Sequence, residues 1–217
     1  VVAAMRAHPD SAGVQENACG ALINLAGNSA DNASAIAAAG GIEAVVAAMR
    51  AHPDSAGVQE SACWALLNLA GNSADNKSTI AAAGGIEVVV AAMRAHPDSA
   101  GVQENACWAL RNLAGNSADN ASAIAAAGGI EAVVAAMRAH DGSAEVQEQA
   151  CWALRNLAGN SADNASAIAA AGGIEAVVAA MRAHPDSAGV QEDACWALIN
   201  LAGNSADNAS AIAAAGG

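Results

Sequence analysis

The chain of 217 residues contains no tyrosine or phenylalanine, and its only aromatic side chains are 4 tryptophans. Positive charge is also scarce, because 8 lysines and arginines stand against 21 acidic residues and give a net charge of −13. Binding to nucleic-acid phosphates begins with clustered Lys and Arg, so we expect no nucleic-acid partner. No apolar run reaches the roughly 18 residues of a membrane span, and we expect no membrane partner. At 54% hydrophobic residues the chain is not intrinsically disordered.

What the chain does contain is one unit copied about five times. Histidines recur every 44 residues, and the methionines keep the same step. A fixed period of this length is the signature of a solenoid, in which each unit buries its apolar face against its neighbours. We therefore predict a single repeat solenoid over residues 1–217. Its predicted units are 1–40, 41–84, 85–128, 129–172 and 173–217.

The start of each unit carries the spacing of a helix. Apolar residues from Ile42 to Met49 fall at i, i+3, i+4 and i+7, which is the helical template rather than the alternation of a strand. Pro53 disfavours helix in the residue before it, so this helix of medium length should end at His52.

Two serines open the other helices of the unit. Ser55 is suited to cap a long helix over residues 56–70, and Gly71 is expected to end it in the left-handed conformation. Ser73 opens a short alanine-rich helix, which ends before the sharp turn at Gly84–Gly85. No segment resembles a strand. The predicted fold class is all-α, with three helices per unit.

The long helix directs its largest apolar residue away from its own core. At about 100° per residue, Ala62 and Cys63 lie within about 60° of Leu66, the centre of the buried side. Trp64 and Asn68 both lie about 160° from it, on opposite sides. We therefore expect both side chains on an outward face.

Differences among the copies fall on the same helix. They are confined mainly to three columns of corresponding positions, spaced three residues apart, so we expect one exposed helical stripe. A stripe that varies over a constant core is typical of a surface that determines ligand specificity. The columns are Asn17, Ser61, Asn105, Gln149 and Asp193; Gly20 against Trp64, Trp108, Trp152 and Trp196; and Ile23, Leu67, Arg111, Arg155 and Ile199.

The segment ACWALLNLAGN from Ala62, on its long helix, and the AAAGGIE turn resemble the armadillo repeat over essentially the whole chain. HEAT repeats are the nearest competitor but usually have two helices. The resemblance implies a right-handed α-solenoid whose third helices line a concave groove, where Trp and Asn hold an extended peptide. It assigns peptide binding to Asn24, Trp64, Asn68, Trp108, Asn112, Trp152, Asn156, Trp196 and Asn200. The first unit departs from the pattern, with Gly20 in place of Trp.

Structural alternatives exist for the same residues. Each indole could cap the core at a repeat junction, and each Asn could bond to a neighbouring helix terminus. Arg111 and Arg155 could be solvated ion-pair partners of Glu residues or could read an acidic ligand, while Asp193 would favour a basic ligand side chain nearer the C-terminus.

No feature indicates catalysis. Cysteines on the core face recur every 44 residues, at distances of about 8–10 Å or more that exclude disulfides, and the histidines lack metal-ligand spacing. Free buried thiols predict a reducing, cytoplasmic or otherwise intracellular location for a natural protein. We expect no enzyme activity, no cofactor and no metal.

The near-identity of the units favours a consensus-like or engineered protein. Val1 corresponds to a position inside a helix and Gly217 to the start of a unit, which predicts head-to-tail self-association through uncapped ends. The predicted function is a non-enzymatic peptide-binding scaffold. The alternatives are a purely structural or self-assembling module and a transport-receptor-like adaptor for basic localisation peptides.

Overall fold

The computed structural model describes residues 1–27, 29–71, 73–159, 161–203 and 205–216. Gly217, the last residue of the predicted fifth unit, lies outside these ranges. The described residues form helices and no strands, which confirms the all-α class. They fall into two compact units, Val1–Leu113 and Ala114–Gly217, and each is described by itself.

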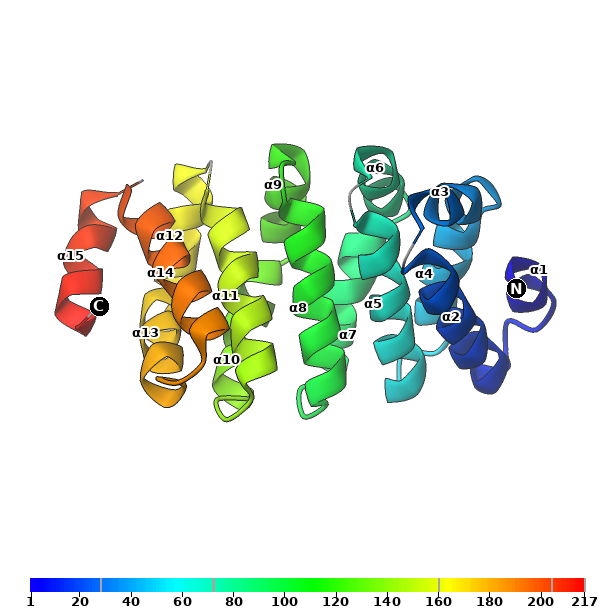
Figure 1. The fold of residues 1–217 in the computed structure, drawn as a ribbon, viewed down its shortest axis with the longest axis horizontal. Coiled ribbons are helices and arrows are strands. Elements are labelled where there is room, and N and C mark those ends of the chain that lie inside the picture. The colour runs from blue at the N-terminus through cyan, green and yellow to red at the C-terminus, as the bar shows by residue number, and fades with distance from the viewer. Residues whose placement is uncertain (28, 72, 160, 204, 217) are drawn as a thin grey trace. The chain divides into compact units, whose positions relative to one another are not determined.

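Helices of medium, long and short length alternate along both units (Figure 1). The first unit holds α1 (Val2–Ala7), α2 (Ala12–Ala26), α3 (Ala30–Ala38), α4 (Gly41–Ala51), α5 (Ala56–Ala70), α6 (Ala74–Ala82), α7 (Gly85–Ala95) and nearly all of α8 (Ala100–Ala114). The second holds α9 (Ala118–Ala126), α10 (Gly129–Ala139), α11 (Ala144–Ala158), α12 (Ala162–Ala170), α13 (Gly173–Ala183), α14 (Ala188–Gly203) and α15 (Ala206–Ala215).

The predicted helix boundaries are confirmed at their caps. Ser55 accepts a hydrogen bond from the Val58 backbone N–H at 3.4 Å, and Ser73 accepts one from the Asn76 N–H at 3.2 Å. These bonds satisfy amides that have no partner inside the helix. Gly84 has φ 78°, as the expected sharp turn requires.

The expectation for Gly71 is wrong. Its φ is −58°, so it is not left-handed. In the third repeat the left-handed residue is Asn116, one position after the corresponding glycine, with φ 58°. Asparagine tolerates this conformation because its short polar side chain can bond locally.

Long helices pack side by side within each unit. Figure 1 shows α2 beside α5 in the first unit and α11 beside α14 in the second, with the medium helices behind them. The core between these layers is aliphatic, and its largest fully buried side chains include Ile42, Leu66, Leu69, Leu110, Ile130, Leu154 and Leu157.

A buried glutamine ties each long helix to the medium helix before it. Gln59 is only 2% exposed, and its Nε2 donates to the carbonyls of Met49 (2.9 Å) and His52 (2.8 Å). Pro53 has no N–H to offer the Met49 carbonyl four residues earlier, so the glutamine supplies the missing donor. Gln15, Gln103 and Gln191 make the same pair of bonds in their own repeats, and so does Gln147, in whose repeat Asp141 stands in place of the proline.

In the described ranges, no single helix is both long enough and apolar enough to cross a bilayer. Four pairs of consecutive helices reach that length and apolarity only together, and each pair is bent by 69° to 72°. One such pair joins α3 to α4.

Candidate functional site

The tryptophans lie on the outward side of the long helices, as the helical angle predicts. Trp64 on α5 and Trp196 on α14 are 46% and 43% exposed. Trp108 on α8 and Trp152 on α11 are half-buried. An indole with one face in contact and one in solvent can stack a ligand side chain.

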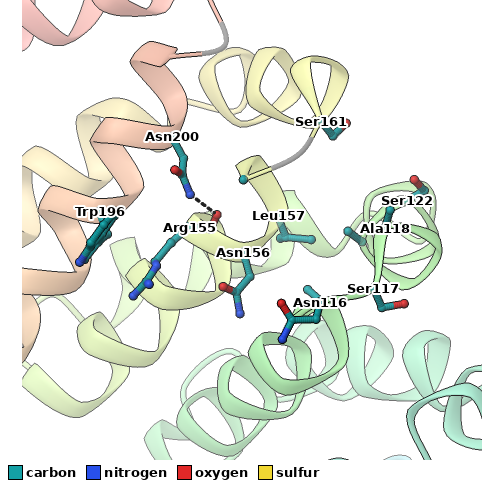
Figure 2. Close-up of a pocket in the computed structure, with 13 residues that line it drawn as sticks. Asn116, Ser117, Ala118, Ser122, Arg155, Asn156, Leu157, Ser161, Trp196 and Asn200 are labelled. Atoms are coloured by element: carbon teal, nitrogen blue, oxygen red, sulfur yellow. Dashed lines mark hydrogen bonds between the residues drawn. The ribbon is translucent and has the colours of Figure 1, made fainter. Parts of the chain in front are cut away.

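The asparagines next to this tryptophan column bond to the preceding repeat. Asn68 Nδ2 donates to the Ile23 carbonyl at 3.2 Å. Corresponding bonds join Asn112 to Leu67 (3.0 Å) and Asn200 to Arg155 (2.9 Å), the latter drawn in Figure 2. The structure therefore contains the bond to a neighbouring helix that the sequence left open as an alternative. A role of these asparagines in peptide binding stays a prediction, because a carboxamide has a second N–H and an acceptor oxygen.

The two columns that flank the tryptophans are not one exposed stripe. Leu67, Asn105, Gln149 and Asp193 are buried, with 3% to 9% of their surface exposed, so the expectation of exposure is wrong for them. The physical reason is that the flanks of a long helix face the long helices beside it, which a single helical projection does not include. Asn17, Asn24 and Ile199 are exposed, whereas Ser61, Ile23, Arg111 and Arg155 are half-buried. The specificity role of both columns stays a prediction.

Arg155 is held by three side chains. Its Nη1 lies 3.4 Å from Oδ1 of Asp193, and its Cζ lies 5.4 Å from the Trp152 ring and 4.8 Å from the Trp196 ring. Arg111 stacks on Trp108 in the same manner, at 5.6 Å. Arg155 therefore forms an ion pair, but its partner is the buried Asp193 and not one of the glutamates that the sequence suggested. Asp193 faces this arginine inside the repeat junction, so its carboxylate already has a cation of the chain as partner, and its preference for a basic ligand side chain stays a prediction.

A hollow of about 720 Å³ adjoins Arg155 in the second unit (Figure 2). Its lining is largely polar, and only four of its residues, Arg155, Asn156, Trp196 and Asn200, were predicted from the sequence. The remaining polar residues are Asn116, Ser117, Ser122 and Ser161. Two of them, Ser117 and Ser161, cap short helices, and the SADN segment that recurs in every copy was the available signal.

Burial determines how readily the cysteine thiols ionise. It raises the pKa of Cys19, Cys63 and Cys151 to about 12. Cys107 is buried as well, but Cys195 is exposed, so the expectation of a core position is wrong for this residue. Among the described residues, the only long helix packed against α14 is α11, and Cys195 lies on a side of α14 that no long helix covers. Among the described residues, no group of three His, Cys, Asp or Glu side chains could hold a metal ion.

Cys195 is expected to be the one thiol of the native protein that reacts rapidly with Ellman's reagent near pH 8. The thiolate is the reactive form, and a thiol with pKa near 12 is ionised in only about one part in ten thousand at that pH. The other four thiols should react only after unfolding in urea. Replacement by Cys195→Ser should abolish the fast phase. A fast phase that survives this substitution would contradict the assignment.

Comparison with known families decides the identity of the repeat. The family model described as Armadillo/beta-catenin-like repeat matches residues 29–71, 73–115, 117–159 and 161–203. The chain belongs to the armadillo-repeat family. The matched armadillo repeats begin at the short helix, whereas the units predicted from the sequence begin at the medium helix.

Solved structures agree with this armadillo fold. An engineered protein aligns at 32% identity and TM-score 0.83, covering 95% of this chain and 80% of that one. Computationally designed armadillo repeat proteins for modular peptide recognition align at 22% identity and TM-score 0.86, covering 99% and 86%. A designed armadillo repeat protein in complex with the peptide (KR)4 aligns at 24% and 0.80, covering 92% and 80%. No curated protein matches the chain. The predicted α-solenoid of armadillo repeats is confirmed.

Proposed function

We propose that this armadillo-repeat chain is a binding scaffold that holds an extended peptide along the outward face of its long helices and catalyses no reaction. The observation that carries the proposal is the tryptophan column. Trp64 leaves 46% of its surface in solvent, although nothing in the fold of its own helix requires a large apolar residue there. Aromatic side chains that are both anchored and exposed are the usual hot spots of binding surfaces.

The neighbouring asparagines suit the backbone of an extended peptide. Each Nδ2 bond of Asn68 and Asn112 to the preceding repeat uses one of two amide hydrogens. The bond also fixes the orientation of the carboxamide, which lowers the entropic cost of binding a ligand. A side chain held in this way can still accept from a peptide N–H.

Relatives of the same fold support the proposal. Designed armadillo proteins are made for modular peptide recognition, and one has been solved with (KR)4. The net charge of −13 is compatible with a cationic ligand of this kind, because opposite charge accelerates encounter.

The test is a fluorescence screen of labelled extended peptides, followed by titration of Trp64→Ala with the best binder. We expect the affinity to fall about tenfold or more, since truncation of an aromatic hot spot costs at least 1–2 kcal/mol. The melting temperature should change little, because the indole is half in solvent. Asn112 is a poorer target, since its substitution also removes a bond between repeats.

Ser78→Ala serves as the control, because Ser78 is an exposed residue of the short helix α6 in the same unit. This substitution should leave the affinity unchanged. If no peptide binds, or if Trp64→Ala lowers the melting temperature and not the affinity, the scaffold is structural and the proposal is wrong.

A further inference from the structure

The space between Trp152 and Trp196 already contains a cation. We call this space the Trp152–Trp196 notch. The guanidinium of Arg155 lies 5.4 Å from one ring centre and 4.8 Å from the other, within the range of a cation–π contact. Figure 2 shows the Arg155 side chain running alongside the Trp196 ring. The arrangement is the one that a ligand arginine would adopt between two indoles.

Asp193 holds the guanidinium in this place. Its Oδ1 lies 3.4 Å from Arg155 Nη1, and its side chain is 7% exposed while that of Arg155 is 28% exposed. The carboxylate comes from α14 and the arginine from α11, so the pair forms as the two repeats pack. A cation that is both stacked and paired with a buried carboxylate leaves this position only at a cost.

We call the space between the tryptophans of two successive repeats a tryptophan step. The residue that corresponds to Arg155 in the first unit's Trp64–Trp108 step is not a cation. Between Trp64 and Trp108 the equivalent residue is Leu67, which is 3% exposed. The residue corresponding to Asp193 is Asn105, which is neutral. The chain therefore carries the same tryptophan step in two forms, one with a charged pair and one without.

We infer that Arg155 is a built-in occupant of the Trp152–Trp196 notch, which excludes the lysine and arginine side chains of a bound peptide from this step. The inference rests on the proposed function. Basic ligand side chains then bind at the Trp64–Trp108 step, while the Arg155 step accepts only uncharged or acidic neighbours. A peptide is read with different preferences in the two units although the tryptophans are the same.

The double variant Arg155→Leu/Asp193→Asn tests this inference in the full chain. It copies Leu67 and Asn105 from the corresponding positions, so its folding has a precedent in the same protein. It removes one positive and one negative charge, so the net charge and the long-range attraction of a cationic ligand stay the same. The probe is a fluorescein-labelled (Lys-Arg)4 peptide. We expect its affinity to rise about fivefold to tenfold over wild type, the effect of one additional cation–π contact of about 1 kcal/mol. Unchanged or weaker binding would overturn the inference.

A second probe requires no peptide. In Arg155→Ala the notch is vacated while Asp193 stays in place, so free L-argininamide should bind there. We expect it to raise the melting temperature and change the tryptophan fluorescence of this variant saturably, and to leave wild type unaffected. An equal response of wild type and variant would overturn the inference.

The two probes separate the inference from the proposed function. If argininamide rescues Arg155→Ala but no peptide binds either protein, the notch is a cation site and the proposed function has failed. If peptides bind wild type but the double variant gains nothing and argininamide has no effect, the proposed function stands and Arg155 is only a structural ion-pair partner. If a (Glu)8 peptide loses affinity in the double variant while (Lys-Arg)4 gains none, Arg155 reads a ligand carboxylate instead, and the inference is wrong.

Discussion

Replacing Gln59 by leucine is expected to lower the free energy of unfolding by about 2–4 kcal/mol. The glutamine is 2% exposed and donates to two carbonyls at the end of α4. Without it the Met49 carbonyl has no donor, because the residue four positions later is Pro53, and a buried acceptor left unpaired carries its full desolvation penalty. The His52 carbonyl still accepts a hydrogen bond from the Ser55 N–H, so losing the glutamine bond there lowers the stability less. Urea unfolding followed by circular dichroism measures the change.

Gln191→Leu is the matched control. Gln191 makes the same two bonds on α14 but is only half-buried, so solvent can reach the carbonyls when the side chain is gone. Gln191→Leu should therefore lower the free energy of unfolding by much less than Gln59→Leu does. Equal costs in the two repeats would show that the buried bonds are not what stabilises the junction.

The second large effect is expected for Gly85→Ala at the turn between repeats. A Cβ at this buried position would lie 2.8 Å from the Ile80 carbonyl oxygen and 2.5 Å from Ile80 Cγ2. Because the nearest atoms include backbone, α6 and α7 must move apart, and overpacking of this kind costs about 1–3 kcal/mol or more. The measurement is again the urea midpoint.

Gly13→Ala is expected to change the stability in the opposite direction. Gly13 lies in α2, and a Cβ there meets nothing within 4 Å. Alanine in a helix is favoured over glycine by up to about 1 kcal/mol, so this variant should be slightly more stable than wild type. Destabilisation of both variants to the same extent would contradict the role given to close packing at Gly85.

The sequence predicted the features that depend on local rules. The helix boundaries of the repeat depend on residues that act within a few positions, such as Pro53, Ser55, Ser73 and Gly84. These boundaries could therefore be predicted from the sequence alone. The outward direction of Trp64 follows from helical geometry alone. The left-handed Asn116 after α8 could not be predicted, because glycine and the asparagine after it can both adopt that conformation.

The contacts between repeats could not be predicted from the sequence. Leu67 and Asp193 lie on the flanks of long helices, and only the packing of neighbouring helices shows that these flanks are buried. The core glutamines were missed although the sequence carried a signal for them. Gln59 lies only about 20° from Leu66 on the helical projection, and a glutamine is present at this position in every copy. A polar residue on the core side was a usable signal that a backbone carbonyl in need of a donor lies opposite it.

The central claim is that peptides bind across the tryptophan column. Its most direct test is to follow the four indole N–H signals by nuclear magnetic resonance while the best peptide from the screen is added. We expect saturable shifts of the Trp64 and Trp108 signals, assigned by Trp→Phe variants, at the concentrations that give half-maximal anisotropy. Binding that leaves all four indole signals unmoved would contradict the account.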